Sequence, residues 1–190
     1  MKSAALSLPL VIALAASLGG CVTLLPKEAP AQLYSFGPPA ADAPAQFAEV
    51  RVTTHFPSAA QGDGILTMTA DQAAYLAGAR WVSPAVLMFE AQARSALVAE
   101  RGAAGSLDLV IDVLRFETDY DQGPGQAPTV RIEAAFTFSD PGGHKKLSRR
   151  FVAVRLASDN RVGAIVAAYD AAVVELFKDM NALEAEAQPS

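Results

Sequence analysis

The feature that most constrains the fold of this chain is an alternation of apolar and polar residues in its second half. Apolar side chains occupy every second position of residues 130–138, and Arg131 and Glu133 lie between them. A period of two indicates a β-strand with one buried face. Residues 140–143 (Asp-Pro-Gly-Gly) follow as a hairpin turn, and residues 145–156 are the expected return strand. The chain is therefore expected to contain an antiparallel sheet.

Shorter patterns predict the rest of the sheet. Further strands are expected at residues 33–36, 50–52, 65–69 and 107–116. In the last of these the alternation reverses phase at Leu114 and Phe116, which indicates either a β-bulge or a strand that becomes buried on both faces.

Two segments have helical periodicity. Residues 84–101 begin with Pro84 in the first turn and Ser83 as a candidate cap, and residues 162–180 place apolar side chains on one face for about five turns. The expected fold class is α+β, a mainly antiparallel sheet with two amphipathic helices packed on one face.

The amino terminus has the pattern of an export signal. Lys2 precedes an uncharged apolar run that is too short to cross a bilayer of about 30 Å as a helix. The run ends in Leu18-Gly19-Gly20-Cys21, which resembles the bacterial lipobox that a signal peptidase recognises. We expect a diacylglycerol thioether on Cys21, cleavage before it, and an N-acyl chain on the freed amine. The alternative is a secreted or inner-membrane protein whose cysteine is incidental.

These assignments divide the chain into four parts. Residues 1–20 form the signal peptide, residues 21–46 the lipidated cysteine and a Pro/Ala-rich tether that includes the short strand, residues 47–185 the folded domain and residues 186–190 a tail. Two or three acyl chains would make the anchor practically permanent. Because Val22 and not aspartate follows the cysteine, the sorting rule of enterobacteria predicts the periplasmic face of the outer membrane.

Composition argues against several classes of function. The 190 residues include 20 acidic and 15 basic side chains, a formal net charge of −5, so the basic excess typical of nucleic-acid-binding surfaces is missing. A lone cysteine excludes an intramolecular disulfide and a thiolate metal cluster. Neither a phosphate-binding glycine loop nor a dinucleotide motif is present. We expect no cofactor other than the acyl groups on Cys21.

No catalytic or metal site is expected. His55 and His144 are the two histidines, each in a predicted loop or turn without a nucleophile motif, so exposed polar positions are the simpler interpretation. Glu117, Asp119 and Asp121 alternate past a strand but lack the glycine and terminal glutamate of a calcium loop, which favours a solvated strand end.

A group of cations stands out in this acidic chain. Lys145, Lys146, Arg149, Arg150 and Arg155 fall within eleven residues of the predicted return strand. Charges on an edge strand prevent sheet-to-sheet aggregation. The alternative is a basic docking edge for an acidic partner or for lipid headgroups.

Several segments together resemble the ABC-type transport auxiliary lipoprotein family, which includes the paraquat-inducible protein C-like lipoproteins that accompany mammalian-cell-entry (MCE) domain proteins. The resemblance covers roughly residues 32 to 180, and its most telling part is Arg80-Trp81 before a helix. The matching segments are the strand at Tyr34, residues 64–69, Tyr75-Leu76, residues 80–84 and residues 114–117.

The resemblance implies a non-enzymatic accessory subunit of an intermembrane phospholipid transport system. Its implied partners are an MCE-domain protein and an inner-membrane ABC transporter, and self-association into a homo-oligomer stays open. Tyr75, Arg80 and Trp81 are the candidate partner-binding residues, although Trp81 could instead pack under the first helix. Two other functions stay open: a periplasmic lipid carrier with a pocket lined by Phe89, Phe136 and Phe177, and a structural envelope lipoprotein.

Overall fold

A computed structural model of the chain describes residues 31–37, 50–101, 107–123, 125–140, 142–143 and 146–187. The strands formed by these residues are β1 (Gln32–Tyr34), β2 (Val50–His55), β3 (Gly64–Thr69), β4 (Gln72–Trp81), β5 (Leu107–Asp119), β6 (Thr129–Ser139) and β7 (Lys146–Leu156). The helices are α2 (Ala85–Arg101) and α3 (Val162–Ala187). The α+β class is confirmed.

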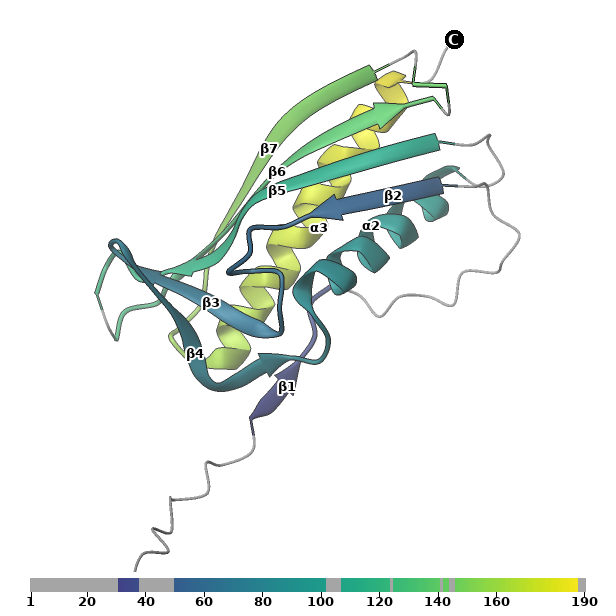
Figure 1. Cartoon of the computed structure of the whole chain (residues 1–190). Coiled ribbons are helices and arrows are strands. Elements are labelled where there is room, and N and C mark those ends of the chain that lie inside the picture. Colours follow the sequence, from purple (N-terminus) through teal and green to yellow (C-terminus); the bar gives the residue numbers. More distant parts are fainter. Residues whose placement is uncertain are drawn as a thin grey trace, which may run out of the picture. The chain divides into compact units, whose positions relative to one another are not determined.

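The seven strands form one mixed sheet in the order β1-β4-β3-β5-β6-β7, with β2 also paired to β5 (Figure 1). The pairs β3–β4, β5–β6 and β6–β7 are antiparallel, whereas β1–β4, β2–β5 and β3–β5 are parallel. The sheet is therefore less uniformly antiparallel than the sequence suggested. The difference arises because β1 and β2 reach their partners through crossovers, which join parallel strands, and not through hairpins.

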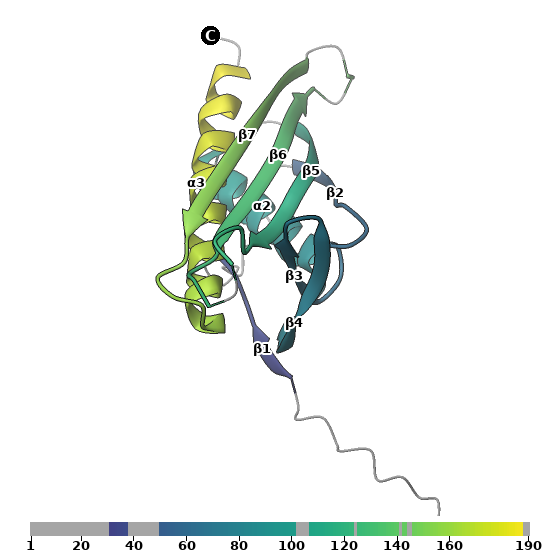
Figure 2. The same ribbon diagram turned by 90° about the vertical axis from the view of Figure 1, so that its left-hand side faces the viewer.

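Both helices lie on one face of the sheet, as expected (Figure 2). α3 packs along β6 and β7, while α2 packs against β2 and touches α3. The other face of β5, β6 and β7 is free of helices and is called the outer face below. In the described residues, neither helix is long and apolar enough to cross a membrane.

Aromatic side chains fill the space between helices and sheet. Phe36, Trp81, Phe116 and Tyr169 are all at most 2% exposed, and their rings contact one another edge-on or tilted. The Thr118 hydroxyl donates a hydrogen bond of 3.2 Å to the Tyr169 hydroxyl, so this buried phenol group has a partner. The pKa of Tyr169 is raised far above its usual value, chiefly by burial.

The phase reversal in β5 is a β-bulge, which confirms one of the two interpretations. The pairing with β6 shifts register between Val113 and Arg115, and Leu114, the residue between them, is 45% exposed. After the bulge, Phe116 returns to the core, and Glu117 faces outward. The extra residue thus directs Arg115 and Glu117 to the outer face.

The beginning of α2 is tied to the loop between β2 and β3. The amide groups of Ala85 and Val86 donate to the carbonyl oxygens of Gly62 and Gln61, at 2.8 and 3.4 Å. These amides belong to the first helical turn, where no intrahelical acceptor exists. The loop therefore caps the helix by its backbone and ties the start of α2 to the segment between β2 and β3.

Candidate partner-docking surface

Tyr75 and Arg80 lie on β4 beside the loop that joins β2 to β3. The ring of Tyr75 lies against the backbone of Gly64, where an added Cβ would stand 2.6 Å from the ring. The Tyr75 hydroxyl donates to the carbonyl oxygen of Ala59 at 2.9 Å. Arg80 Nη1 lies 3.1 Å from Asp63 Oδ1 and 3.2 Å from Asp63 Oδ2. Tyr75 is 59% exposed and the Arg80 side chain 57%, so both stay accessible to a partner.

These two side chains and the loop line an open pocket of about 400 Å³. Its walls include Ser58, Gln61 and Leu76. The loop is held to β4, because the Trp81 amide donates to the Asp63 carbonyl oxygen at 2.7 Å. The size falls in the lower part of the range for small-molecule sites, about 300–1,000 Å³. Tyr75 and Arg80 beside the pocket are therefore held in place by hydrogen bonds between β4 and the loop.

Trp81, the third candidate interface residue, lies in the core. Its side chain is 2% exposed, and its ring centroid lies 5.0 Å from that of Phe36 and 5.1 Å from that of Tyr169. Side chains alternate along a strand, so Arg80 and Trp81 point to opposite faces of β4. Trp81 thus packs in the core against Tyr169 of the second helix, α3, whereas the alternative interpretation placed it under the first helix. Arg80 alone of the pair reaches the surface.

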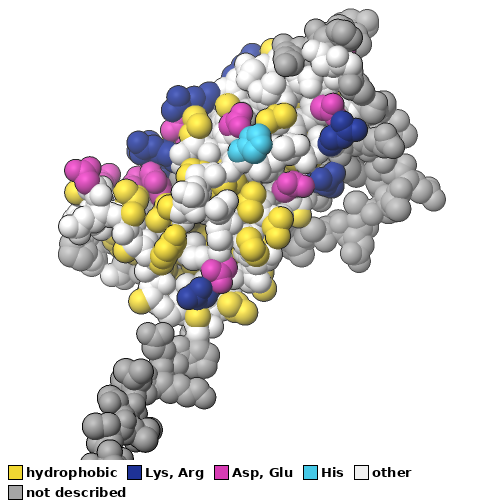
Figure 3. Space-filling model, viewed as in Figure 1, with side chains coloured by type: hydrophobic (Ala, Val, Ile, Leu, Met, Phe, Trp, Pro, Cys, Tyr) yellow, Lys and Arg dark blue, Asp and Glu magenta, His cyan; other side chains and the backbone are white. Residues whose placement is uncertain are grey.

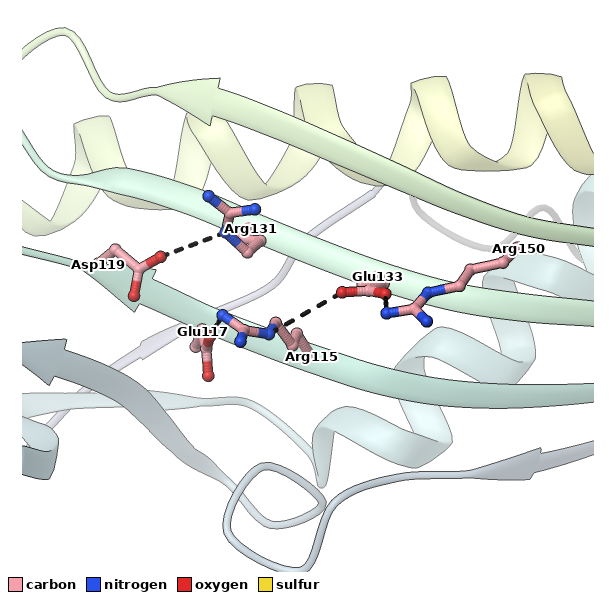
Figure 4. Close-up of polar contacts among 6 residues, drawn as sticks. All are labelled: Arg115, Glu117, Asp119, Arg131, Glu133 and Arg150. Carbon is pink, nitrogen blue, oxygen red and sulfur yellow. Dashed lines mark hydrogen bonds and ion pairs between the residues drawn. The ribbon is translucent and has the colours of Figure 1, made fainter. Parts of the chain in front are cut away.

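The outer face carries a network of ion pairs across β5, β6 and β7 (Figure 4). Its members are Arg115, Glu117, Asp119, Arg131, Glu133 and Arg150. Arg115 lies 3.2 Å from Glu117, and Arg131 lies 3.4 Å from Asp119. In the β5–β6 register, Arg115 faces Glu133 and Glu117 faces Arg131, so opposite charges meet across the strands at both positions.

Glu133 is the most enclosed carboxylate of this network. Its side chain is 8% exposed and forms ion pairs with Arg150 and, at 3.9 Å, with Arg115. The pKa of Glu117 is raised by partial burial and by the neighbouring charge of Asp119, although Arg115 and Arg131 oppose the shift. Three cations and three anions balance, so the network adds no net charge to the outer face.

Beside this network, β7 exposes a row of aliphatic side chains. Val152, Val154 and Leu156 point to the outer face and are 49%, 40% and 69% exposed. Within the described residues β7 pairs with β6 alone, so one edge of β7 has free backbone groups. An unpaired edge with exposed aliphatic side chains is suited to binding another chain. The sequence indicates this row, because residues 151–154 are apolar on both faces of the strand. The sequence prediction instead emphasised the nearby cations.

The arginines of the predicted basic edge pair with acids of the same chain. Arg149 forms two hydrogen bonds with Glu186 of α3, at 3.1 and 2.9 Å, and Arg155 lies 2.6 Å from Glu175 of α3. Arg150 pairs with Glu133 on the opposite face, because neighbouring residues of a strand point in opposite directions. Lys145 and the side chain of Lys146 lie outside the described residues.

Several other residues considered in the sequence analysis also lie outside the described part of the chain. These are the lipobox residues Leu18, Gly19, Gly20 and Cys21, and His144. Lipidation at Cys21 stays a prediction.

The expectation for His55 needs correction. It ends β2 and does not lie in a loop, because parallel pairing with β5 continues to the pair His55–Asp112. Its Nδ1 lies 2.8 Å from Asp112 Oδ1 on an exposed part of the sheet.

Glu117 and Asp119 lie within β5 and not past the end of a strand, because β5 extends to Asp119. Both belong to the ion-pair network, and Asp121, which follows β5, is exposed. In the described residues no three His, Cys, Asp or Glu side chains are grouped to hold a metal ion.

The three phenylalanines named for a lipid pocket are packed in the core. Phe89 and Phe136 are 0% exposed and Phe177 is 7% exposed. The rings of Phe89 and Phe177 lie 5.0 Å apart between the two helices, and Phe136 contacts Phe151 of β7 at 5.9 Å. Because these rings contact one another and their neighbours, the packing weighs against a lipid-carrying cavity at this place.

The fold and this surface define a class of protein: a small α+β domain with an exposed sheet edge and an ion-paired outer face. The model of the ABC-type transport auxiliary lipoprotein component family matches residues 34–181, and the chain belongs to this family. The family consists of auxiliary lipoprotein components of ABC-type transport, as the sequence resemblance indicated.

Two solved structures show the same fold. A protein from Xanthomonas campestris has 22% identity and a TM-score of 0.63, with 78% of this chain and 92% of that chain covered. An uncharacterized protein has 15% identity and a TM-score of 0.63, with 80% and 97% covered. No curated protein gives a significant match.

Proposed function

We propose that this protein is a non-enzymatic, lipid-anchored accessory subunit of an MCE/ABC-type intermembrane phospholipid transport system. It docks the periplasmic MCE assembly at the outer membrane. The observation that carries the proposal is the family match over residues 34–181, which begins shortly after a lipobox that ends at Cys21. Anchor, tether and domain then follow one another in the order that such a subunit requires.

The acyl chains would confine the domain to one membrane surface. Confinement raises the effective concentration of the domain for a partner that reaches the same surface, without requiring a tight interface. A modest docking surface is therefore sufficient, and the aliphatic row of β7 with its free edge offers one.

The carrier alternative has less support. The packed rings of Phe89, Phe136 and Phe177 occupy the space that a bound acyl chain would need. A structural envelope lipoprotein has the same anchor and domain, so it differs from an accessory subunit only in its partners.

Affinity purification from solubilised membranes tests the proposal. The tagged full-length chain is expected to fractionate with the outer membrane and to recover an MCE-domain protein together with its ATPase. The variant Cys21→Ser is expected to leave the envelope fraction, because it has no acyl anchor. Recovery of neither partner by the anchored protein would favour the structural alternative, and an unmodified Cys21 thiol in mass spectrometry would remove the anchor from the proposal.

A further inference from the structure

The end of the sheet at which the tether joins the domain exposes large apolar side chains. Leu33 of β1 is 64% exposed, and Val82, directly after β4, is 58% exposed. In the parallel register of β1 and β4, Leu33 faces Arg80 and Tyr34 faces Trp81. The Val82 amide donates to the Tyr34 carbonyl oxygen at 2.7 Å, which continues the ladder. Because side chains alternate, Leu33, Arg80 and Val82 share the side of the pair that faces away from the core.

A third apolar side chain lies near this end. Leu87 is 57% exposed in the first turn of α2, and that turn is tied to Gly62 by the Ala85 amide. Figure 3 shows hydrophobic side chains in the lower part of the view, around one adjacent basic and acidic pair. We call Leu33, Val82 and Leu87 the β1-end patch.

The charges beside this patch cancel. Arg80 and Asp63 form an ion pair at 3.1 Å, although the chain as a whole has a formal net charge of −5. An anionic leaflet repels unpaired carboxylates and tolerates aliphatic side chains at its interface. The β1-end patch is therefore compatible with a lipid surface.

The tether limits how far this end can lie from the anchor. Ten residues, 22–31, separate Cys21 from Gln32. Even fully extended, ten residues span at most about 33–36 Å. We propose that the β1-end patch rests on the lipid leaflet that holds the acyl chains of Cys21, so that the domain has a fixed orientation on the membrane. This inference relies on the lipid anchor of the proposed function.

The chain offers a clean labelling experiment, because its single natural cysteine is the acylated one. Full-length acylated protein carrying Leu33→Cys or Val82→Cys is labelled with an environment-sensitive fluorophore and reconstituted into phosphatidylcholine/phosphatidylglycerol vesicles that contain brominated lipid. Leu156→Cys is the matched control, since Leu156 is 69% exposed on β7. Quenching at positions 33 and 82 is expected to be at least about threefold stronger than at 156, because interfacial apolar groups lie about 5–10 Å into the headgroup and acyl boundary.

A second set of variants tests whether the side chains cause the contact. In a Leu87→Cys background, the double change Leu33→Glu and Val82→Glu is expected to abolish most of the quenching at position 87. The matched change Val152→Glu and Val154→Glu is expected to leave that quenching unchanged. Equal quenching at 33, 82 and 156, or no effect of the first double change, would overturn the inference. Dye uptake by the chain without an introduced cysteine is a different result, because it would show a free Cys21 and refute the anchor itself.

Discussion

The packing of the Tyr75 ring depends on the absence of a side chain at Gly64. The Tyr75 ring occupies the space that a Cβ at Gly64 would need. Gly64→Ala is expected to lower the free energy of unfolding by about 1–3 kcal/mol, since overpacking displaces the ring and its hydrogen bond to Ala59. In a Tyr75→Ala background the same change should cost much less. Urea unfolding followed by the fluorescence of Trp81, the single tryptophan, measures all four corners of this cycle. Equal costs in both backgrounds would show that the two positions are independent.

Glu117 makes the stability of the domain depend on pH. Burial and Asp119 raise its pKa above the ordinary value near 4.5, so the folded state favours the protonated carboxyl. A group with a raised folded-state pKa stabilises the fold at low pH, and this contribution is lost as pH rises through the folded pKa. Glu117→Gln keeps a polar side chain without the charge. The free energy of unfolding of the variant minus that of wild type is therefore expected to be greater at pH 7 than at pH 4. Urea unfolding of both proteins at both pH values measures this difference. A relative stability that moves in the opposite direction would contradict this account.

Among the strands, β7 is the one whose exposed side chains suit a docking role. Val154→Lys places a charge in the aliphatic row, and the change should be tolerated because Val154 is 40% exposed. Under the proposed function it is expected to reduce recovery of the MCE-domain protein about tenfold, as a desolvated charge in an interface costs roughly 1–3 kcal/mol. Val174→Lys on α3 is the matched control, since Val174 is 56% exposed and belongs to the helix layer on the other side of the sheet from the outer face. Equal recovery by both variants would place the docking surface elsewhere.

The elements that sequence reasoning predicted are those with long local periodicity. The β6–β7 hairpin and both helices follow from the spacing of apolar residues together with the turn and cap residues, and the spacing at Leu114 gave the bulge as one of two interpretations. The sequence did not predict β4. Residues 72–78 contain three alanines and a glycine, and they lack the alternation between buried and exposed side chains that indicates a strand. Pairing with β3 and β1 determines the conformation of β4, and such pairing does not require a periodic pattern of apolar residues in the sequence.

The candidate surface was only partly predictable for the same reason. Tyr75 and Arg80 were found as exposed residues, but the position of Trp81 depends on the face of an unpredicted strand. The ion-pair network requires the β5–β6 register, which brings Arg115 opposite Glu133 across eighteen residues of sequence. The lipobox, in contrast, is predicted from four adjacent residues alone, without knowledge of the fold.

At the scale of the whole molecule, the domain separates its two proposed contacts. β1 and β7 are the terminal strands of the sheet order, with four strands between them along that path. The β1-end patch and the aliphatic row of β7 therefore lie at opposite margins of the sheet. A partner bound at β7 would not compete with the leaflet for the same surface, which is what an adaptor between a membrane and a protein assembly requires.

This arrangement also fixes where mechanical tension would act. A pull between the anchored leaflet and a partner held at β7 would run across the hydrogen-bonded strands in series. Two ladders on this path are short: β3–β5 has two residue pairs and β1–β4 has three, whereas the β5–β6 and β6–β7 ladders have eleven each. Under load the two short ladders would open before the long ones, so the part of the sheet formed by β5, β6 and β7 would stay closed.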